Sequence, residues 1–378
     1  MCNAASEKTA AKRLLREIRF LRHLRGHPNV VSVEDVVVRR SKGSIDVYIV
    51  TELMEADLEQ IIKSSQALSN EHVRCLIFQL MNGIRHMHHA GIVHRDLKPA
   101  NCVVDSQCRL KVCDLGLSRH VTDVELVPEG EDAKFTDYVV TRWYRAPELL
   151  MGNKRYTTKV DMWAVGCVLA ELIGRRPIFP GDDTSDMLVR ISSKMGKPSL
   201  ETIAELGGEE AARNFVSAIP PRDTPGLPSL YLGADSAALE LLGSLLTWSV
   251  QERAGIDDAM ASRYVRELHE APRVLQTNHL EMAVISHWAL PSWKILDLIC
   301  MEGASWQTRG AHCRVASKVH GSATSGKGLK YDGIMAVGQD VACSCGMQFS
   351  SGSALLAHLA EDELAGAVPD SHDQPMEC

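Results

Sequence analysis

An apolar stripe with the period of an α-helix is the first strong pattern along the chain. The stripe falls within residues 9–25, and Gly26-His27-Pro28 follows it directly. Apolar side chains three and four residues apart lie on one helix face, and Gly and Pro interrupt helices. We therefore expect an amphipathic helix over residues 9–25, with its apolar face formed by Leu14, Leu15, Ile18, Leu21 and Leu24.

Two β-rich runs and a second helical pattern come next. Val30–Val38 and Ile45–Val50 are rich in β-branched residues and flank a polar Ser-Lys-Gly-Ser turn at residues 41–44, which predicts an antiparallel strand pair. Apolar residues between Val73 and Met87 then repeat with helical period and predict a long helix. The pattern stays mainly helical to about residue 270, with loops at residues 176–183 and 219–228.

The character of the chain changes after about residue 272. Residues 307–340 are rich in Gly, Ser, Ala and Lys with weak periodicity, and residues 361–378 are polar. Such segments bury too little apolar surface to offset the entropy of ordering. We therefore expect residues 273–378 to form a poorly ordered tail.

Composition narrows the class of protein. The chain has 378 residues, of which 45% are hydrophobic and 24% charged, and its net charge is −7. The mild acidity argues against nucleic-acid binding, and the longest apolar run, Met162–Ala170, is too short to cross a membrane. Eleven cysteines without a regular framework favour a reducing compartment. The basic amphipathic start also permits an organelle-targeting segment as an alternative.

Candidate chemistry gathers in the run from His94 to Asn101. Asp96 is a candidate base, Lys98 a counter-charge for a phosphoryl group, and Asn101 a metal ligand. Asp114 follows a short loop later and adds a second hard oxygen ligand for Mg²⁺. These residue types are those needed to transfer a phosphoryl group from Mg-ATP to a hydroxyl group.

Three motifs in order resemble the protein-kinase signature: the catalytic run His94–Asn101, Asp114-Leu115-Gly116, and Ala146-Pro147-Glu148. The resemblance covers about residues 10–270. It implies an α+β fold with two lobes, in which residues 1–53 form an incomplete β-rich small lobe that lacks the Gly-rich loop and the Lys strand. Residues 54–272 would form a mainly helical large lobe with an insert at about 199–235, and residues 273–378 would be an unrelated tail.

Thr136-Asp137-Tyr138 and the following segment to Glu148 resemble the activation segment of a mitogen-activated protein kinase. In that family the Thr and the Tyr are both phosphorylated, so the resemblance implies that Thr136 and Tyr138 form a regulatory switch. It also implies that Thr141 contacts Asp96 near the substrate.

The same resemblance assigns arginines to the two phosphates, because added phosphate charge needs arginine partners to order a loop. Arg16, Arg95 and Arg119 would converge on phosphorylated Thr136, while Arg142 and Arg145 would receive phosphorylated Tyr138. The alternative is that these arginines are ordinary solvated surface charges.

Residues 46–58 resemble the last small-lobe strand and the hinge that binds adenine. Thr51 would be the gatekeeper, Glu52 and Met54 would pair with adenine through their backbones, and Asp57 would reach the ribose. Val103 and Cys113 would line the floor of the pocket, although simple core packing explains these two residues equally well.

Two further family positions would support the fold. Asp161 resembles the buried helical Asp that anchors the catalytic loop, and Arg253 would form a buried ion pair with Glu148.

Glu17 resembles the helix residue that pairs with the phosphate-binding Lys, but that Lys belongs on a strand that would precede residue 1. Its absence, with that of the Gly-rich loop, would weaken phosphate binding.

We therefore expect a serine/threonine kinase that uses ATP and Mg²⁺, acts on protein substrates and is activated by an upstream dual-specificity kinase. It would be cytoplasmic with access to the nucleus, without nucleic-acid or membrane partners. The alternatives are a catalytically silent binding protein or decoy, and a gene product with a longer N-terminus. Cys345 and His358, with Phe349 and Leu355 between them, match the inner half of a zinc finger, but Cys343 is one residue too close to Cys345 and we expect no zinc binding.

Overall fold

The computed structural model describes residues 8–41, 44–121, 141–153, 157–206, 224, 226–269 and 299, together with short strands between 335 and 349. Contacts divide the chain into two compact units. The first consists of Met1–Ser6, Val33–Glu52 and Leu296–Cys378, and the second of Glu7–Ser32 and Leu53–Ile295. The N-terminal helix therefore groups with the second unit.

The first unit contains the predicted strand pair. Strands β1 (Val33–Ser41) and β2 (Ser44–Thr51) are antiparallel, with Val36 opposite Ile49. Its C-terminal part contains three further antiparallel strands in the order β10-β9-β8. Each has only two or three residues, too few for a periodic pattern to appear in the sequence, and they are β8 (Met335–Val337), β9 (Asp340–Ala342) and β10 (Gln348–Phe349).

Helix α1 (Lys8–His23) confirms the first predicted helix of the sequence. Its stripe buries Leu15, Ile18 and Leu21 almost completely. The helix ends before Gly26, whose φ of 93° is accessible to glycine at little cost.

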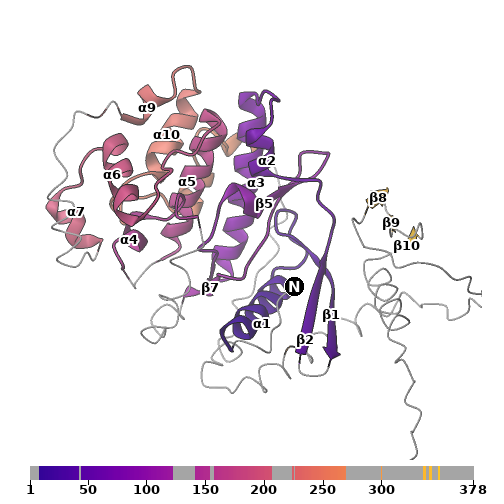
Figure 1. The fold of residues 1–378 in the computed structure, drawn as a ribbon. Helices are drawn as coiled ribbons and strands as arrows, with labels where there is room; N and C mark the ends of the chain where they lie inside the picture. The colour runs from indigo at the N-terminus through magenta and orange to yellow at the C-terminus, as the bar shows by residue number, and fades with distance from the viewer. Residues whose placement is uncertain are drawn as a thin grey trace, which may run out of the picture. The chain divides into compact units, whose positions relative to one another are not determined.

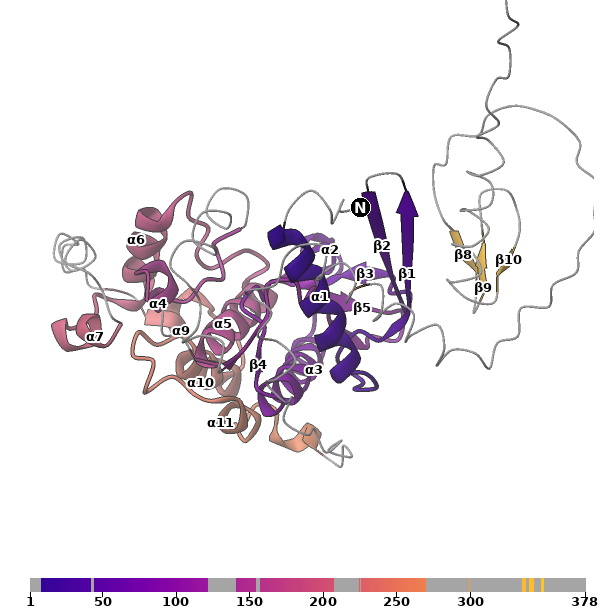
Figure 2. The same ribbon diagram turned by 90° about the horizontal axis from the view of Figure 1, so that it is seen from below.

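Two long helices form the centre of the second unit. In α3 (Asn70–His89), the Ser69 hydroxyl accepts a hydrogen bond from the backbone N–H of His72 and so caps the first turn. In α5 (Lys159–Gly174), every residue from Val160 to Leu172 is buried, as expected for a core helix. Figures 1 and 2 show α3 and α5 side by side, with α10 (Ser236–Leu245) packed on α5.

Short strands position the loops that carry the candidate chemistry. Strand β4 (Ile92–Val93) pairs with β7 (Arg119–His120), and a small sheet has the order β3-β5-β6. The catalytic run lies between β4 and β5, and Asp114 follows β6. The strands of this sheet are β3 (Ala56–Asp57), β5 (Cys102–Val104) and β6 (Leu110–Val112).

The remaining described elements are short helices that surround this framework. They are α2 (Leu58–Lys63), the 3₁₀ turn η1 (Pro99–Asn101), α4 (Pro147–Leu150), α6 (Thr184–Met195), α7 (Leu200–Glu205), α9 (Gly226–Leu230), α11 (Ile256–Met260) and η3 (Arg266–His269). The expected mixture of helix and sheet is confirmed. Within the described ranges, no helix is both long and apolar enough to span a bilayer.

Candidate active site

Asp96 is held by two neighbours from its own loop. Lys98 Nζ donates to Asp96 Oδ2 over 2.8 Å, and Asn101 Nδ2 donates to the same oxygen over 3.2 Å and to the Asp96 carbonyl over 2.8 Å. Among the described residues, Asp96 Oδ1 accepts no hydrogen bond. The loop therefore fixes the carboxylate and leaves one oxygen for an incoming hydroxyl group.

His94 links this loop to the segment that carries Asp114. Its side chain is fully buried, and its Nδ1 accepts a hydrogen bond from the backbone N–H of Asp96 over 3.2 Å. Because Nδ1 accepts, the ring proton lies on Nε2, which donates to the carbonyl of Cys113 over 3.1 Å. A neutral imidazole thus couples the candidate base to the residue before Asp114.

Asp161 anchors the backbone of the catalytic loop. Its two oxygens accept hydrogen bonds from the backbone N–H groups of His94 and Arg95, and from His88 Nε2, each over 2.8 Å. Burial acts to raise the pKa of Asp161, but the hydrogen bond from His88 and the backbone hydrogen bond from Arg95 hold it below its usual value. Arg95 has a φ of 72°, so the anchor also stabilises a strained backbone.

The predicted role of Asp161 as an anchor agrees with this geometry, while sequence reasoning missed His88. No spacing in the sequence signals this contact. The contact itself depends on the packing of α3 against α5.

Asn101 and Asp114 offer the oxygen atoms that a magnesium ion prefers. The Asn101 amide nitrogen is used on Asp96, so its carbonyl oxygen can face a cation. The side chain of Asp114 is exposed, and its φ is 61°. Burial, and then repulsion from Asp114, raise the pKa of Glu17 to about 7, so Glu17 lies close enough to Asp114 for their charges to interact. These residues fit Mg²⁺, whose other ligands are usually water and phosphate oxygens.

Of the predicted adenine residues, Thr51 ends strand β2 and Asp57 ends strand β3. Thr51 and Glu52 belong to the first unit, and Met54 and Asp57 to the second. Asp57 Oδ1 accepts a hydrogen bond from the backbone N–H of Gln60 over 2.8 Å and caps α2. The adenine and ribose contacts of these residues remain a prediction.

The floor residues Val103 and Cys113 lie in and beside the small sheet. Val103 pairs with Asp57 across the β3–β5 ladder. Burial, followed by the nearby charge of Asp114, raises the pKa of the Cys113 thiol to about 12, so the thiol is neutral at physiological pH. Both residues are half-buried, which fits a pocket floor and core packing alike.

Three arginines from separate segments gather around Leu117 and Ser118. Arg95 Nη1 donates to the carbonyl of Leu117 over 3.3 Å, and Arg119 Nη1 donates to that of Ser118 over 3.1 Å. Arg16 Nη1 lies 3.5 Å from the Ser118 carbonyl oxygen. The structure thus brings together the predicted phosphate-receiving set, although Thr136 and Tyr138 lie outside the described residues.

The second predicted arginine pair lies in the turn before α4. The backbone N–H of Arg145 donates to the carbonyl of Arg142 over 3.0 Å, and both side chains are half-buried. Thr141 is exposed, and within the described part of the chain no hydrogen bond joins it to Asp96. Its predicted contact with Asp96 stays a prediction.

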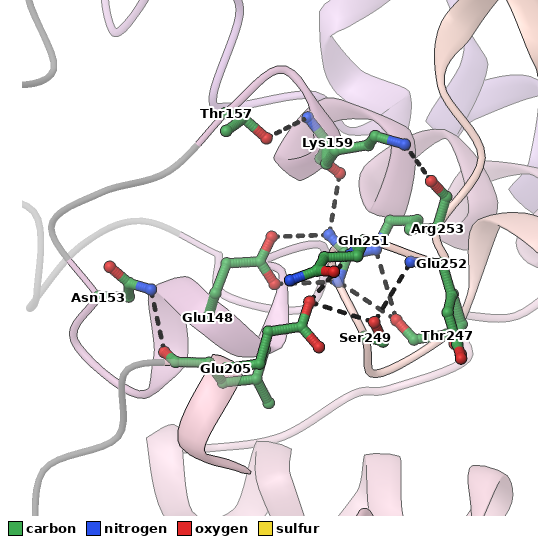
Figure 3. A network of polar contacts seen from close by, with 11 residues as sticks. Glu148, Asn153, Thr157, Lys159, Glu205, Thr247, Ser249, Gln251, Glu252 and Arg253 are labelled. Carbon is green, nitrogen blue, oxygen red and sulfur yellow. Dashed lines mark hydrogen bonds and ion pairs between the residues drawn. The ribbon is translucent and has the colours of Figure 1, made fainter. Parts of the chain in front are cut away.

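Glu148 and Arg253 form the predicted buried ion pair (Figure 3). The two guanidinium nitrogens donate to the two carboxylate oxygens over 2.6 and 3.0 Å, and both side chains are almost fully buried. Arg253 also donates to the backbone carbonyls of Lys159 and Thr247. The pair therefore ties α4 to α5 and to the segment before α11.

Three features together define a protein kinase. They are a carboxylate held by Lys and Asn, a second Asp after a short strand pair, and an α+β fold. Residues 2–265 match the family model described as protein kinase domain. Within this class, the chain belongs to the mitogen-activated protein kinases, which are serine/threonine protein kinases.

The relatives that support this assignment are plant and fungal proteins. The chain is 42% identical over 271 residues to mitogen-activated protein kinase homolog NTF3 of Nicotiana tabacum, covering 71% of this chain and 70% of that protein. It is 41% identical over 269 residues to mitogen-activated protein kinase 7 of Arabidopsis thaliana, covering 71% of each. Identity to mitogen-activated protein kinase MPS1 of Pyricularia oryzae is 39% over 269 residues, covering 71% of this chain and 64% of that protein.

Proposed function

We propose that this chain transfers the γ-phosphoryl group of ATP to serine or threonine hydroxyl groups of protein substrates. The arrangement of Asp96, Lys98 and Asn101 carries the proposal. Lys98 and Asn101 both engage Asp96 Oδ2, so Oδ1 is oriented to accept the hydrogen bond of a substrate hydroxyl group. Positioning of this kind is the main task of a protein in phosphoryl transfer.

Lys98 has a second role in the proposed reaction. Its ammonium group lies beside the base and would neutralise charge that develops on the transferring phosphoryl group. Asn101 and Asp114 would hold Mg²⁺, which when bound neutralises phosphate charge. Thr51, Glu52, Met54, Asp57, Val103 and Cys113 would hold the nucleoside.

Regulation would follow the pattern of the family. An upstream dual-specificity kinase would phosphorylate Thr136 and Tyr138, and the first phosphate would be received by Arg16, Arg95 and Arg119. The gathering of these three guanidinium groups around Leu117 and Ser118 supports this role. Protein substrates would be met in the cytoplasm and the nucleus.

A phosphotransfer assay on the doubly phosphorylated chain tests the proposal. The chain is incubated with Mg-ATP labelled in the γ-phosphate and a library of Ser- and Thr-containing peptides. Asp96→Asn should lower the rate about 10³-fold, as expected for loss of a positioned base. Asp257→Asn is the matched control, because Asp257 is largely exposed and pairs with Arg85 at the surface. Nucleotide binding without phosphotransfer by the unsubstituted chain would instead favour the silent binding protein.

A further inference from the structure

Two half-buried thiols from separate elements lie beside the same amide group. Cys75 is on α3, Cys108 is in the turn between β5 and β6, and both are free cysteines. Gln79 Nε2, one helical turn after Cys75, donates to Cys75 Sγ over 3.3 Å and to the Cys108 carbonyl oxygen over 2.9 Å. A single nitrogen atom thus contacts both cysteines.

The turn that carries Cys108 is held in place against α3. Gln79 Oε1 accepts a hydrogen bond from the backbone N–H of Leu110 over 2.9 Å. Within the turn, Asp105 Oδ1 accepts from the backbone N–H of Arg109 over 2.9 Å, and the Cys108 N–H donates to the Asp105 carbonyl over 3.0 Å. The backbone of Cys108 therefore has a defined position beside the helix that carries Cys75.

The two sulfur atoms also interact electrostatically. Burial, and then the negative charge of Cys75, raise the pKa of the Cys108 thiol. Cys102 and Cys113 form a second neighbouring pair, but Cys102 is fully buried, as is Cys167. Oxidation of a thiol requires access for the oxidant. Among the cysteines in the described ranges, Cys75 and Cys108 therefore combine proximity with access from solvent.

We propose that Cys75 and Cys108 are a redox-responsive pair that forms a reversible disulfide when the chain meets hydrogen peroxide. The contacts of Gln79 with both cysteines carry the proposal, because they bring two partly accessible thiols from α3 and the β5–β6 turn to one point. This modification site is independent of the proposed phosphotransfer activity.

Cys75 reacts first in the proposed sequence. Its sulfur accepts the Gln79 N–H, and a hydrogen bond of this kind favours the thiolate. The Cys75 sulfur attacks one oxygen of hydrogen peroxide, the O–O bond breaks, and Cys75 sulfenic acid and one water are formed. The Cys108 sulfur then attacks the Cys75 sulfur, the S–O bond breaks, and the hydroxide leaves with the Cys108 thiol proton as a second water. Two thiols are thereby oxidised and one peroxide is reduced.

The disulfide would act on the part of the chain that carries the candidate chemistry. It would close a loop of residues 76–107, which contains the catalytic run His94–Asn101. A cross-link restricts the unfolded chain over the loop that it closes, so the oxidised chain should be more stable. For a loop of this size, oxidation should raise the Tm by about 5 °C, and dithiothreitol should restore the original value.

Peptide mapping of the full chain tests the pairing directly. The reduced chain is treated with a few equivalents of hydrogen peroxide, and the remaining thiols are blocked with N-ethylmaleimide. Digestion uses trypsin and a protease that cleaves before aspartate, because cleavage before Asp105 separates Cys102 from Cys108. Mass spectrometry should find the Cys75–Cys108 linked peptide about tenfold more abundant than the Cys102–Cys113 one, since oxidation follows exposure.

Serine variants test the order of the two steps. Cys108→Ser should accumulate Cys75 sulfenic acid, which dimedone traps, and should lose the rise in Tm. Cys75→Ser should leave Cys108 largely reduced. Cys113→Ser is the matched control, because it removes another half-buried thiol on the neighbouring strand end. It should keep both the Cys75–Cys108 linked peptide and the rise in Tm.

Two results would overturn the proposal. One is a digest in which Cys75 is linked mainly to cysteines other than Cys108, or remains free while other thiols are oxidised. The other is a rise in Tm that persists in Cys108→Ser, because the stabilisation would then come from a different bond. The mapping uses the unsubstituted chain, so it decides the question even if a serine variant fails to fold.

Discussion

Asp161 shows how one side chain can determine the geometry of the catalytic loop. Its carboxylate is fully buried and accepts hydrogen bonds from His88 and from the backbone N–H groups of His94 and Arg95. In an asparagine, one of these oxygens would become an N–H donor that faces other donors. The carboxylate therefore orients the loop in a way that an amide of the same size cannot.

Asp161→Asn should lower the free energy of unfolding by about 3 kcal/mol, because it leaves buried donors without an acceptor. Urea unfolding monitored by circular dichroism would measure the loss. Asp257→Asn is a suitable control, since Asp257 is largely exposed and pairs with Arg85 and His89 at the surface. Its cost should stay below about 1 kcal/mol. Equal losses in the two variants would contradict the proposed anchor.

The sequence was sufficient to predict Asp96, Lys98 and Asn101, because short-range spacing alone brings these three residues together. Sequence spacing could not predict the contact of His88 with Asp161, which requires α3 and α5 to pack side by side. Residue identity is thus easier to predict from sequence than the partner of a buried group.

At the scale of elements, the Glu148–Arg253 pair holds together segments far apart in the chain. Arg253 bridges α4 to the start of α5 through Glu148 and the Lys159 carbonyl (Figure 3). Arg253→Met should cost about 3–5 kcal/mol, since it leaves the Glu148 carboxylate buried without a partner. The double variant Glu148→Met/Arg253→Met should recover much of this loss, as measured by urea unfolding.

The exposed pair Arg263–Glu240 provides the control for this cycle. Its side chains are more than half exposed, and Arg263→Met should cost less than about 1 kcal/mol. If the double variant were no more stable than Arg253→Met alone, the loss would come from packing rather than from an unpaired charge.

Two stacked histidines connect the loop after α1 to α3. The rings of His27 and His86 lie 4.3 Å apart between centroids, and His27 Nδ1 accepts a hydrogen bond from the Asn29 backbone N–H over 3.1 Å. Burial, then the charges of His86 and Lys111, lower the pKa of His27 to about 3. Burial, then His23 and His89, lower that of His86 to about 4. The stack therefore requires neutral rings.

The stability contributed by this stack should depend on pH. Both histidines have lower pKa values in the folded chain than the ordinary 6.5, so the unfolded chain takes up protons first as the pH falls. The stability that the two neutral histidines contribute is fully present above pH 6.5. It is lost as the pH falls from 6.5 toward their pKa values in the folded chain. Between pH 7 and 5, His86→Phe should lose about 1 kcal/mol less than the unsubstituted chain, allowing for solvent screening. Equal losses of stability in the two proteins between pH 7 and pH 5, measured by urea unfolding, would show that the pKa of His86 is the same in the folded and the unfolded chain.

The pattern of apolar residues predicted α1, α3 and the β1–β2 pair because each spans several periods of helix or strand. The three C-terminal strands could not be predicted, since each is shorter than the pattern that would reveal it. The sequence also suggested that α1 belongs with the strands of a small lobe, whereas contacts group it with the helical unit. Which helices and strands group together depends on tertiary contacts, and the periodicity of apolar residues along the chain does not encode such contacts.

For the whole molecule, nucleotide binding should stabilise the folded chain. The proposed metal ligands Asn101 and Asp114 belong to the same unit as Asp57 and Val103. A ligand that binds only the folded chain raises its stability, by about 2.7 kcal/mol at a concentration 100 times its Kd. Mg-ATP should therefore raise the Tm, and EDTA or Asp114→Asn should remove most of the rise, because each removes part of the proposed metal site. An undiminished rise under both conditions would show that the nucleotide binds without the metal that Asn101 and Asp114 are proposed to hold.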